Sequence, residues 1–377
     1  MSTTPPSISD PTELARVLSH YDTGVIKRIE PIRRGVGNSV KWAVACEKGP
    51  FLLKRRPVGV DEPLLALIQM VQMEASRTGF PVPEVVPVRG PGGSTGGALL
   101  LRLDGRLYEL NRFVKSTGFD QSPAACRAAG AMLGRLHGVL AKMVMPPTAP
   151  GVNAGTQSGT RGYHRLLRVQ TELVQMGDRL KAASGSSDAR KIARHLGEMY
   201  TLASERAASA GVEKWPLQLT HGDWHPGNLL FDGAAPGLSS TTTTTTITPP
   251  TTIVGLIDFD SVRPSPRVLD VAYGVLQFSM IRAAGPAQEW PAAADLDRAR
   301  AFVNGYDSDA PALLSREEAS SLNWLMIEAL IAEASGPLAA TGEFGGVDGL
   351  SMARFIENKS AWLRDHQAEI AGLVGGG

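Results

Sequence analysis

LTHGDWHPGNLLF, residues 219–231, and VGLIDFD, residues 254–260, are the two most informative segments of this chain. The first reads as a polar loop between two apolar runs, and it presents His221, Asp223 and Asn228 at fixed offsets. The second reads as a short apolar strand that ends in Asp258. Side chains at the ends of short strands, or on a loop beside them, are held rigidly enough to form a catalytic site.

These residue types match the needs of phosphoryl transfer. That reaction requires a carboxylate near the acceptor hydroxyl, a divalent metal on the phosphates and rigid positioning. Asp223 can orient a hydroxyl and accept its proton, while Asn228 and Asp258 supply the hard oxygen ligands that Mg²⁺ prefers. A His-Gly-Asp string followed by Asn at this spacing arises by chance in roughly one chain in a thousand. The structural alternative is a turn with a capping aspartate and a core histidine.

The first third of the chain is rich in β-prone runs and tight turns. One helix is predicted there, because apolar positions recur at helical spacing from Pro63 to Thr78, and Gly79 then ends the pattern. Together these signals predict a small antiparallel sheet of about five strands with one inserted helix. The predicted strands are Val25–Ile32, Val40–Cys46, Phe51–Arg55, Ala98–Leu103 and Arg106–Val114.

Lys54 and a glycine turn in this region are candidate phosphate-binding groups. Lys54 ends an apolar strand, where a lysine alone is usually a solvated charge, but with the downstream loop we expect it to reach the α- and β-phosphates of a nucleotide. The turn Gly35-Val36-Gly37-Asn38-Ser39 lacks a third glycine. Phosphate contact by the backbone of Gly35 and Gly37 and the Ser39 hydroxyl, and an ordinary β-turn, both remain open. A dinucleotide-binding turn is excluded, because a hairpin follows instead of a helix.

The remainder of the chain is predicted to be mainly helical. Strong helical patterns cover residues 123–143, 188–207 and 315–334. Residues 233–252 contain six consecutive threonines and no apolar periodicity, so we expect a low-complexity surface insertion that is largely disordered, with an extended β-like excursion as the alternative. The predicted domains are residues 1–112, a nucleotide-covering sheet with one helix, and residues 113–377, which carry the catalytic loop and the acceptor site.

Composition narrows the choice of partners and compartment. The chain has 377 residues, a net charge of +1 and two cysteines, Cys46 and Cys126, in apolar surroundings. This charge balance gives no support for a nucleic acid or an anionic membrane as partner. Two such cysteines disfavour a disulfide framework or a zinc site. The first residues lack a secretory signal pattern, so we expect a cytoplasmic protein, monomeric or homodimeric.

The motifs resemble those of the aminoglycoside phosphotransferase/choline kinase superfamily, which shares its fold with the eukaryotic protein kinases. This resemblance implies an α+β, bilobal, protein kinase-like fold, with a small antiparallel-sheet N-lobe and a larger, mainly helical C-lobe. It implies Asp223 as catalytic base, Asn228 and Asp258 as Mg²⁺ ligands, ATP as phosphate donor, and structural roles for His221 and Asp270. The backbone of Arg112, Phe113 and Val114 would bind adenine.

The resemblance implies a hydroxylated small-molecule acceptor: an aminoglycoside, an amino alcohol, homoserine or a sugar-like compound. Glu328 and Glu333 could bind a cationic acceptor, although acids on an amphipathic helix are more often solvated. The chain departs from the family where a helix glutamate would pair with Lys54. That slot falls near Gln69, and the nearest acids are Glu62 and Glu74. A protein kinase-like activity and a catalytically silent kinase-fold binding protein are the alternatives.

Overall fold

The computed structural model describes residues 11–32, 39–90, 97–144, 162–232 and 252–374. The chain forms two compact units: unit 1 comprises Met1–Leu65 and Pro81–Lys115, and unit 2 comprises Ala66–Phe80 and Ser116–Gly377. The assignment of residues 1–112 and 113–377 to separate nucleotide and acceptor functions stays a prediction. Within the described ranges, no helix is both long and apolar enough to cross a bilayer.

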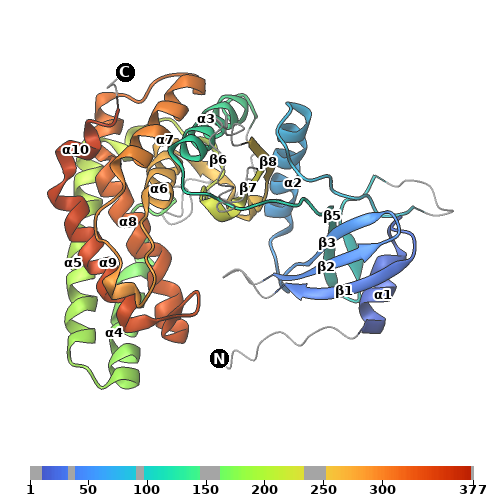
Figure 1. The fold of residues 1–377 in the computed structure, drawn as a ribbon, viewed down its shortest axis with the longest axis horizontal. Helices are drawn as coiled ribbons and strands as arrows, with labels where there is room; N and C mark the ends of the chain where they lie inside the picture. The colour runs from blue at the N-terminus through green and yellow to red at the C-terminus, as the bar shows by residue number, and fades with distance from the viewer. Residues whose placement is uncertain (1–10, 33–38, 91–96, 145–161, 233–251, 375–377) are drawn as a thin grey trace, which may run out of the picture. The chain divides into compact units, whose positions relative to one another are not determined.

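Unit 1 is built on a five-stranded antiparallel sheet with the order β1-β2-β3-β5-β4 (Figure 1). Short turns connect its hairpins because the sequence supplies residues that tolerate positive φ. Asp104 and Gly105, with φ of 49° and 71°, join β4 to β5, and Gly49, with φ of 117°, opens β3. The strand bounds are β1 Ile26–Ile32, β2 Val40–Cys46, β3 Gly49–Arg55, β4 Leu101–Leu103 and β5 Arg106–Arg112.

One face of this sheet packs against helix α1, Pro11–Ser19, which the sequence analysis did not predict. Three apolar positions of α1 are buried, namely Leu14, Val17 and Leu18. They join the sheet side chains in a single apolar core. The strand residues of this core include Trp42, Val44, Phe51, Leu53, Tyr108 and Leu110.

Helix α2, Glu62–Arg77, begins in unit 1 and ends in unit 2. Its C-terminus lies where the sequence indicated, because Gly79 adopts a φ of 88° that allows the chain to turn out of the helix. The N–H of Phe80 then donates to the carbonyl of Ala75 at 3.0 Å.

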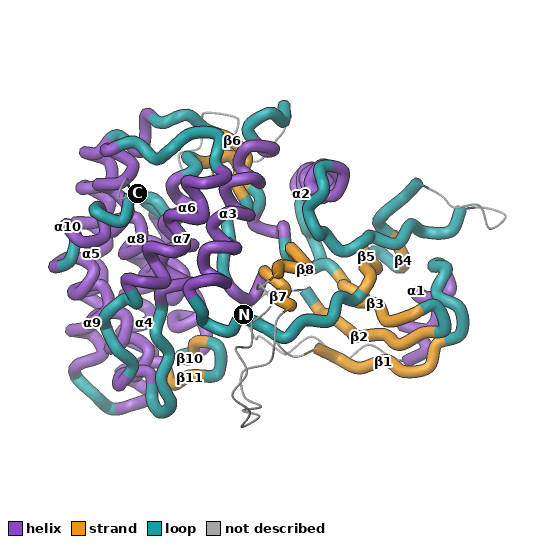
Figure 2. The backbone as a smooth tube through the Cα atoms, turned by 45° about the horizontal axis from the view of Figure 1, so that its top comes forward, coloured by secondary structure: helices purple, strands orange, loops and turns teal. Residues whose placement is uncertain are grey.

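Unit 2 is dominated by helices (Figure 2). Helix α8 is its longest, at 26 residues, and it begins with a capping box in which Ser315 and Glu318 satisfy each other's backbone N–H groups. Buried residues occur all round α8, and it packs against α4, α5, α6 and α9. The helix bounds are α3 Pro123–Leu140, α4 Leu167–Ser184, α5 Asp188–Ala210, α6 Val268–Ser279, α7 Leu296–Asp309, α8 Arg316–Thr341, α9 Gly349–Asp365 and α10 Gln367–Ala371.

Helices α3 and α7 approach each other at backbone distance. A Cβ added to Gly130 of α3 would lie 1.9 Å from the carbonyl oxygen of Phe302 in α7, so no side chain fits there. Gly305 of α7 meets the backbone of Arg127 in the same way, at 2.1 Å. These glycines therefore set the spacing between the two helices.

Short strand pairs in unit 2 hold the motif segments. Strand β6, Gln218–Thr220, pairs with β9, Arg263–Ser265. Strand β7, Leu229–Asp232, pairs with β8, Thr252–Leu256. A third pair links β10, Glu343–Phe344, to β11, Val347–Asp348. The threonine-rich insertion predicted at 233–252 lies outside the described residues except for Thr252, the first residue of β8.

Candidate active site

The two strand pairs bring the two motif segments together. β6 leads into His221 and β7 begins directly after Asn228, so the loop 221–228 spans the gap between the pairs. β8 ends two residues before Asp258. The N–H of Ile257 donates to the carbonyl of Asn228 at 3.0 Å, which fixes the backbone of one predicted metal ligand beside that of the other.

Gly222 is required by the geometry of this loop. Its φ is 76°, a region that side chains disfavour, and a Cβ there would lie 2.3 Å from the carbonyl oxygen of Ser261. The Gly222 backbone therefore passes close to the segment that follows Asp258. Only glycine permits this approach, which explains why the central residue of the His-Gly-Asp string is a glycine.

The carboxylate of Asp270 holds the start of the loop 221–228 in place. It accepts hydrogen bonds from the backbone N–H groups of His221 at 2.7 Å and Gly222 at 2.8 Å. Burial raises the pKa of Asp270, but hydrogen bonding and charge from His137 and the hydrogen bond from the Gly222 N–H outweigh it and leave that pKa lowered. The residue is 2% exposed, and its side chain remains an anion. It has the structural role that the resemblance implied.

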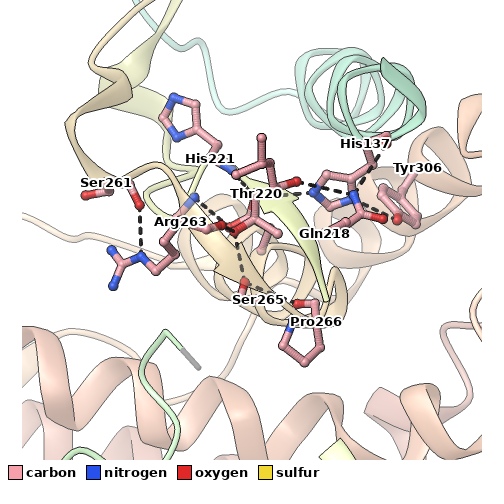
Figure 3. A network of polar contacts seen from close by, with 12 residues as sticks. His137, Gln218, Thr220, His221, Ser261, Arg263, Ser265, Pro266 and Tyr306 are labelled. Carbon is pink, nitrogen blue, oxygen red and sulfur yellow. Dashed lines mark hydrogen bonds and ion pairs between the residues drawn. The ribbon is translucent and has the colours of Figure 1, made fainter. Parts of the chain in front are cut away.

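His137 connects this anchor to the helices. Its Nε2 lies 3.3 Å from Asp270 Oδ2, and its Nδ1 lies 3.0 Å from the hydroxyl of Tyr306. Figure 3 shows His137 beside Tyr306, on the same network as the β6–β9 pair. In that pair, the hydroxyls of Thr220 and Ser265 lie 2.8 Å apart. The loop is therefore supported by buried polar contacts on α3, α6 and α7.

His221 is a packing residue. It is fully buried, its ring lies 5.1 Å from that of Phe259 and 5.4 Å from that of Trp224, and its Nε2 lies 3.3 Å from the carbonyl oxygen of Ile257. Burial lowers its pKa, so the imidazole is neutral. His221 therefore serves the loop structure, as the resemblance implied.

Asp223 and Asn228 are joined side chain to side chain. Asn228 Nδ2 donates to Asp223 Oδ2 at 3.0 Å and to the Asp223 carbonyl at 2.9 Å. Burial raises the pKa of Asp223, but the hydrogen bond and charge of His225 and the hydrogen bond from Asn228 outweigh it, so that pKa is lowered. Asp223 is thus held as a carboxylate that can accept a proton.

His225 is a site residue that the sequence analysis did not assign. Its Nδ1 accepts a hydrogen bond from the Gly227 N–H at 3.0 Å, so a neutral ring carries its proton on Nε2. That Nε2 lies 3.5 Å from Asp223 Oδ2. The sequence signal was present, because His225 stands two residues after Asp223, but its direction depends on the turn at Pro226–Asn228.

The donor set fits a magnesium ion. Because Asn228 uses its amide nitrogen on Asp223, its amide oxygen is left as a hard ligand. Asp258 is held at a φ of 61°, which is unusual for a residue other than glycine and is found most often where a site demands it. Within the described residues, no group of three or more His, Cys, Asp or Glu could hold a metal by itself. A two-residue site of this kind relies on phosphates and water for its other ligands.

The candidate phosphate-binding lysine lies on the charged face of the unit 1 sheet. Lys41, Lys54 and Glu109 are directly opposed on β2, β3 and β5. Directly opposed side chains share one face of a sheet. This row therefore lies on the face opposite the α1 core. Lys54 is 5% exposed, so it is not the solvated charge that a lysine at a strand end usually is.

The other residues predicted to bind the nucleotide lie before β2 and at the end of β5, and their role stays a prediction. Ser39 is half-buried directly before β2, whereas Gly35 and Gly37 lie outside the described residues. The guanidinium of Arg112 lies 4.6 Å from the centre of the Phe51 ring and donates to the carbonyl of Lys48 at 2.7 Å. The N–H of Phe113 is donated to the carbonyl of Pro50 at 3.1 Å. Adenine binding by the backbone of Arg112, Phe113 and Val114 stays a prediction.

The two helix acids considered for acceptor binding differ in their surroundings. Glu328 is fully buried and accepts hydrogen bonds from His164 Nδ1 at 2.8 Å, from the Arg165 N–H at 3.1 Å and from the Ser204 hydroxyl. The expectation that it is solvated is therefore wrong, because α8 is buried on all sides. Glu328 instead ties the segment at 164–165 to the helices.

Glu333 lies close enough to Asp223 for the charge of Asp223 to affect the ionisation of Glu333. Its Oε2 accepts a hydrogen bond from Gln277 Nε2 at 2.8 Å. Burial and the charge of Asp223 raise the pKa of Glu333 to about 7, against the lowering effects of Tyr273, His225 and Arg282. The Tyr273 ring packs against that of Tyr163 at 5.1 Å. Glu333 of α8, Tyr273 of α6 and Tyr163, in the turn before α4, thus lie near the loop 221–228.

Solved structures of low sequence identity share this fold. A microcompartment-associated aminopropanol kinase matches with a TM-score of 0.64 at 17% identity, covering 96% of this chain and 99% of its own. An aminoglycoside phosphotransferase from Alicyclobacillus acidocaldarius matches with a TM-score of 0.58 at 14% identity, covering 98% and 96%. A Plasmodium vivax ethanolamine kinase matches with a TM-score of 0.55 at 12% identity, covering 96% and 86%. The predicted α+β, kinase-like fold is confirmed.

The sequence itself matches a family model. A comparison with curated protein sequences found no match. The model of the phosphotransferase enzyme family, in contrast, matches residues 28–241, which are more than half of the chain and include the loop 221–228. The chain therefore belongs to the phosphotransferase enzyme family.

Proposed function

We propose that this protein transfers the γ-phosphate of ATP to a hydroxyl group of a small molecule that carries an amine. The contact between Asp223 and Asn228 carries the proposal, because it pairs an ionised carboxylate with an amide whose oxygen is left for a metal. Lys54, buried on the charged face of the unit 1 sheet, is the proposed phosphate-binding cation.

The residues divide the reaction between them. Asp223 would orient the acceptor hydroxyl and take its proton as the oxygen attacks the γ-phosphorus. The bond from that phosphorus to the bridging oxygen breaks, and ADP leaves. Asn228 and Asp258 would hold Mg²⁺, which neutralises charge on the phosphates when bound. His225, with its Nε2 directed at Asp223, would keep the carboxylate aligned.

The preference for an amine rests on Glu333. Burial raises the pKa of Glu333, and the charge of Asp223 raises it further, because two carboxyl groups near each other cannot both ionise cheaply. A bound ammonium group would offset that repulsion. The names of the aminopropanol and ethanolamine kinases are in keeping with an acceptor of this chemistry.

The test needs one measurement that is independent of the acceptor. Mg²⁺-dependent formation of ADP should occur slowly with water as acceptor and should be lost in Asp223→Asn. A panel of amino alcohols, aminoglycosides and neutral sugars is then screened for the mass gain of one phosphoryl group. Phosphorylation of neutral sugars alone would refute the amine preference. Absence of both nucleotide binding and ADP formation would favour a silent binding protein.

A further inference from the structure

The carboxyl group of Glu333 is held by two residues of helix α6. Gln277 Nε2 donates a hydrogen bond to Glu333 Oε2 at 2.8 Å. Burial raises the pKa of Glu333 to about 7, and a hydrogen bond from Tyr273 acts in the opposite direction, which identifies Tyr273 as a second donor. Tyr273 and Gln277 stand four residues apart on α6, so they share one face of that helix. Glu333 therefore meets a polar face of α6.

Gln277 leaves an acceptor atom beside this carboxyl. Its amide nitrogen faces Glu333, because an ionised carboxylate accepts hydrogen bonds and cannot donate them. The amide oxygen is thereby turned away, and in the part of the chain that the structure describes no donor meets it. Several fully enclosed polar atoms of the described residues lack a partner, but this oxygen is not one of them, so it reaches solvent. A ligand that brings N–H donors would satisfy it.

The neighbouring aromatic rings do not favour an aromatic cage, which is the usual binding site for a quaternary ammonium group. Tyr273 is 2% exposed, so its ring is covered by protein. Tyr163 is half-buried, and its ring packs against that of Tyr273 with centroids 5.1 Å apart. A cage needs several open ring faces around one cation. This pair can offer only a face of Tyr163.

We propose that Gln277 is a specificity-determining residue that, together with Glu333, selects a primary ammonium group over a quaternary one. The proposal rests on the proposed function for the presence of an amine in the acceptor. A primary ammonium group has three N–H donors, which can be shared between the Glu333 carboxyl and the Gln277 amide oxygen. A quaternary ammonium group has none, so both acceptors would lose water without gaining a hydrogen bond.

Hydrogen bonding is what distinguishes the two kinds of cation here. Both carry one positive charge, so both would offset the repulsion between Glu333 and Asp223. Each N-methyl group, in contrast, removes one donor. The acceptor is therefore expected to be a primary amino alcohol or an amino sugar with a free amine.

The experiment compares acceptors that differ only in methylation of the nitrogen. Ethanolamine and propanolamine are each supplied as the primary amine and as the N-methyl, N,N-dimethyl and N,N,N-trimethyl forms, with saturating Mg²⁺ and ATP. We expect kcat/KM to fall with each methyl group and to be about 10²-fold lower for the trimethyl form than for the primary amine. The loss should lie mainly in KM, because the nitrogen takes no part in the transfer.

A variant of Gln277 tests its role in this selection. Gln277→Met keeps the length of the side chain and removes both amide atoms. It should raise the KM of the primary amines about ten-fold and leave that of the trimethyl forms nearly unchanged. The pH dependence of the primary-amine KM should also move to higher pH, because Glu333 loses a donor that favours its charged form.

The control is Gln175→Met, at an exposed position of α4, which should keep the wild-type ratio of kcat/KM between primary and trimethyl acceptors. Each ratio is measured within a single protein, so a smaller folded fraction of a variant does not change it. The test of Gln277 is thereby independent of any effect of Gln277→Met on stability.

The outcomes separate this inference from the proposed function. Equal kcat/KM for primary and trimethyl acceptors, or a higher value for the trimethyl forms, would overturn the selection of a primary amine. An unchanged ratio in Gln277→Met would overturn the assignment of that selection to Gln277. Phosphorylation of neutral sugars and of no amine would instead refute the amine preference on which the inference rests, and absence of Mg²⁺-dependent ADP formation would refute the transfer itself.

Discussion

Asp270 holds His221 by its backbone: the Asp270 Oδ2 accepts the His221 N–H at 2.7 Å, in a site where both residues are buried. This contact fixes the start of the catalytic loop without using any group that would touch a substrate. It also makes the geometry of the loop depend on whether the buried carboxylate of Asp270 is ionised.

The first prediction concerns this anchor. Asp270→Asn places an amide where a carboxylate accepts two backbone N–H groups, so we expect a loss of about 3 kcal/mol in the free energy of unfolding. Urea denaturation at pH 7 measures it. Because the folded pKa of Asp270 is lowered, its stabilisation is present above the ordinary value of 3.8 and is lost as pH falls toward the folded pKa. The difference in the free energy of unfolding between Asp270→Asn and the wild type should therefore narrow below about pH 4.

A second substitution tests the proposed base. Asp223→Asn removes the proton acceptor but keeps the side-chain size, so we expect kcat to fall by about 10²–10⁴-fold. The dissociation constant of the nucleotide should change little, since Asp223 is assigned to the acceptor. Single-turnover transfer and calorimetry separate the two. A variant that turns over at the normal rate would remove Asp223 from the mechanism.

The assignment of Asp258 to the metal predicts a change in magnesium dependence. Asp258→Asn should raise the Mg²⁺ concentration for half-maximal activity by about ten-fold and lower the maximum rate, because a neutral amide is a weaker ligand. Asp232→Asn, at the exposed end of β7, is the control and should leave the titration unchanged. Identical Mg²⁺ titrations for Asp258→Asn and wild type would contradict the assignment.

Glu333 predicts a pH dependence in two measurements. Its folded pKa of about 7 lies above the ordinary value, so the folded protein holds the proton more tightly and stability falls as pH rises from about 4.5 to 7. Glu333→Gln should therefore be more stable than the wild type at pH 8, by about 3 kcal/mol, and equal to it near pH 4. As the pH rises over the same range, Glu333 becomes charged, so the KM of an amine acceptor should fall in the wild type but not in Glu333→Gln.

Glu317→Gln is the control for this prediction, because Glu317 lies exposed in the first turn of the same helix. A stability difference that does not vary with pH would show that Glu333 is not a titrating group in this range. If the acceptor KM varied with pH in the same way in the wild type and in Glu333→Gln, Glu333 would have no part in amine binding.

The catalytic loop, the five-stranded sheet and the predominance of helix in the second part were accessible from the sequence because each has a local signal. The loop residues occur at fixed offsets, the hairpins have turn residues, and α3 and α5 have helical periodicity. α1 was missed because nine residues with three buried apolar positions have little local signal, and the helix is stabilised by packing against the sheet.

Other site features depend on tertiary structure. Glu328 and Glu333 are the same residue type on one helix, and only the packing around α8 makes the first a buried anchor and the second a neighbour of Asp223. Glu109 was likewise hidden, because its relation to Lys54 comes from strand register across more than fifty residues of sequence. His225 acquires its direction from a turn whose geometry no motif specifies.

The close contact of α3 with α7 has a consequence for how this enzyme can diversify. The glycines at that contact set the spacing between His137 of α3 and Tyr306 of α7. Because His137 also contacts Asp270, the same glycines affect the position of Asp270. A single added methyl group there would disturb the catalytic loop from a distance. Glu333 belongs to a different helix, α8, which carries none of these three residues. Mutations that explore new acceptors can therefore accumulate around it while the position of the loop anchor stays constant.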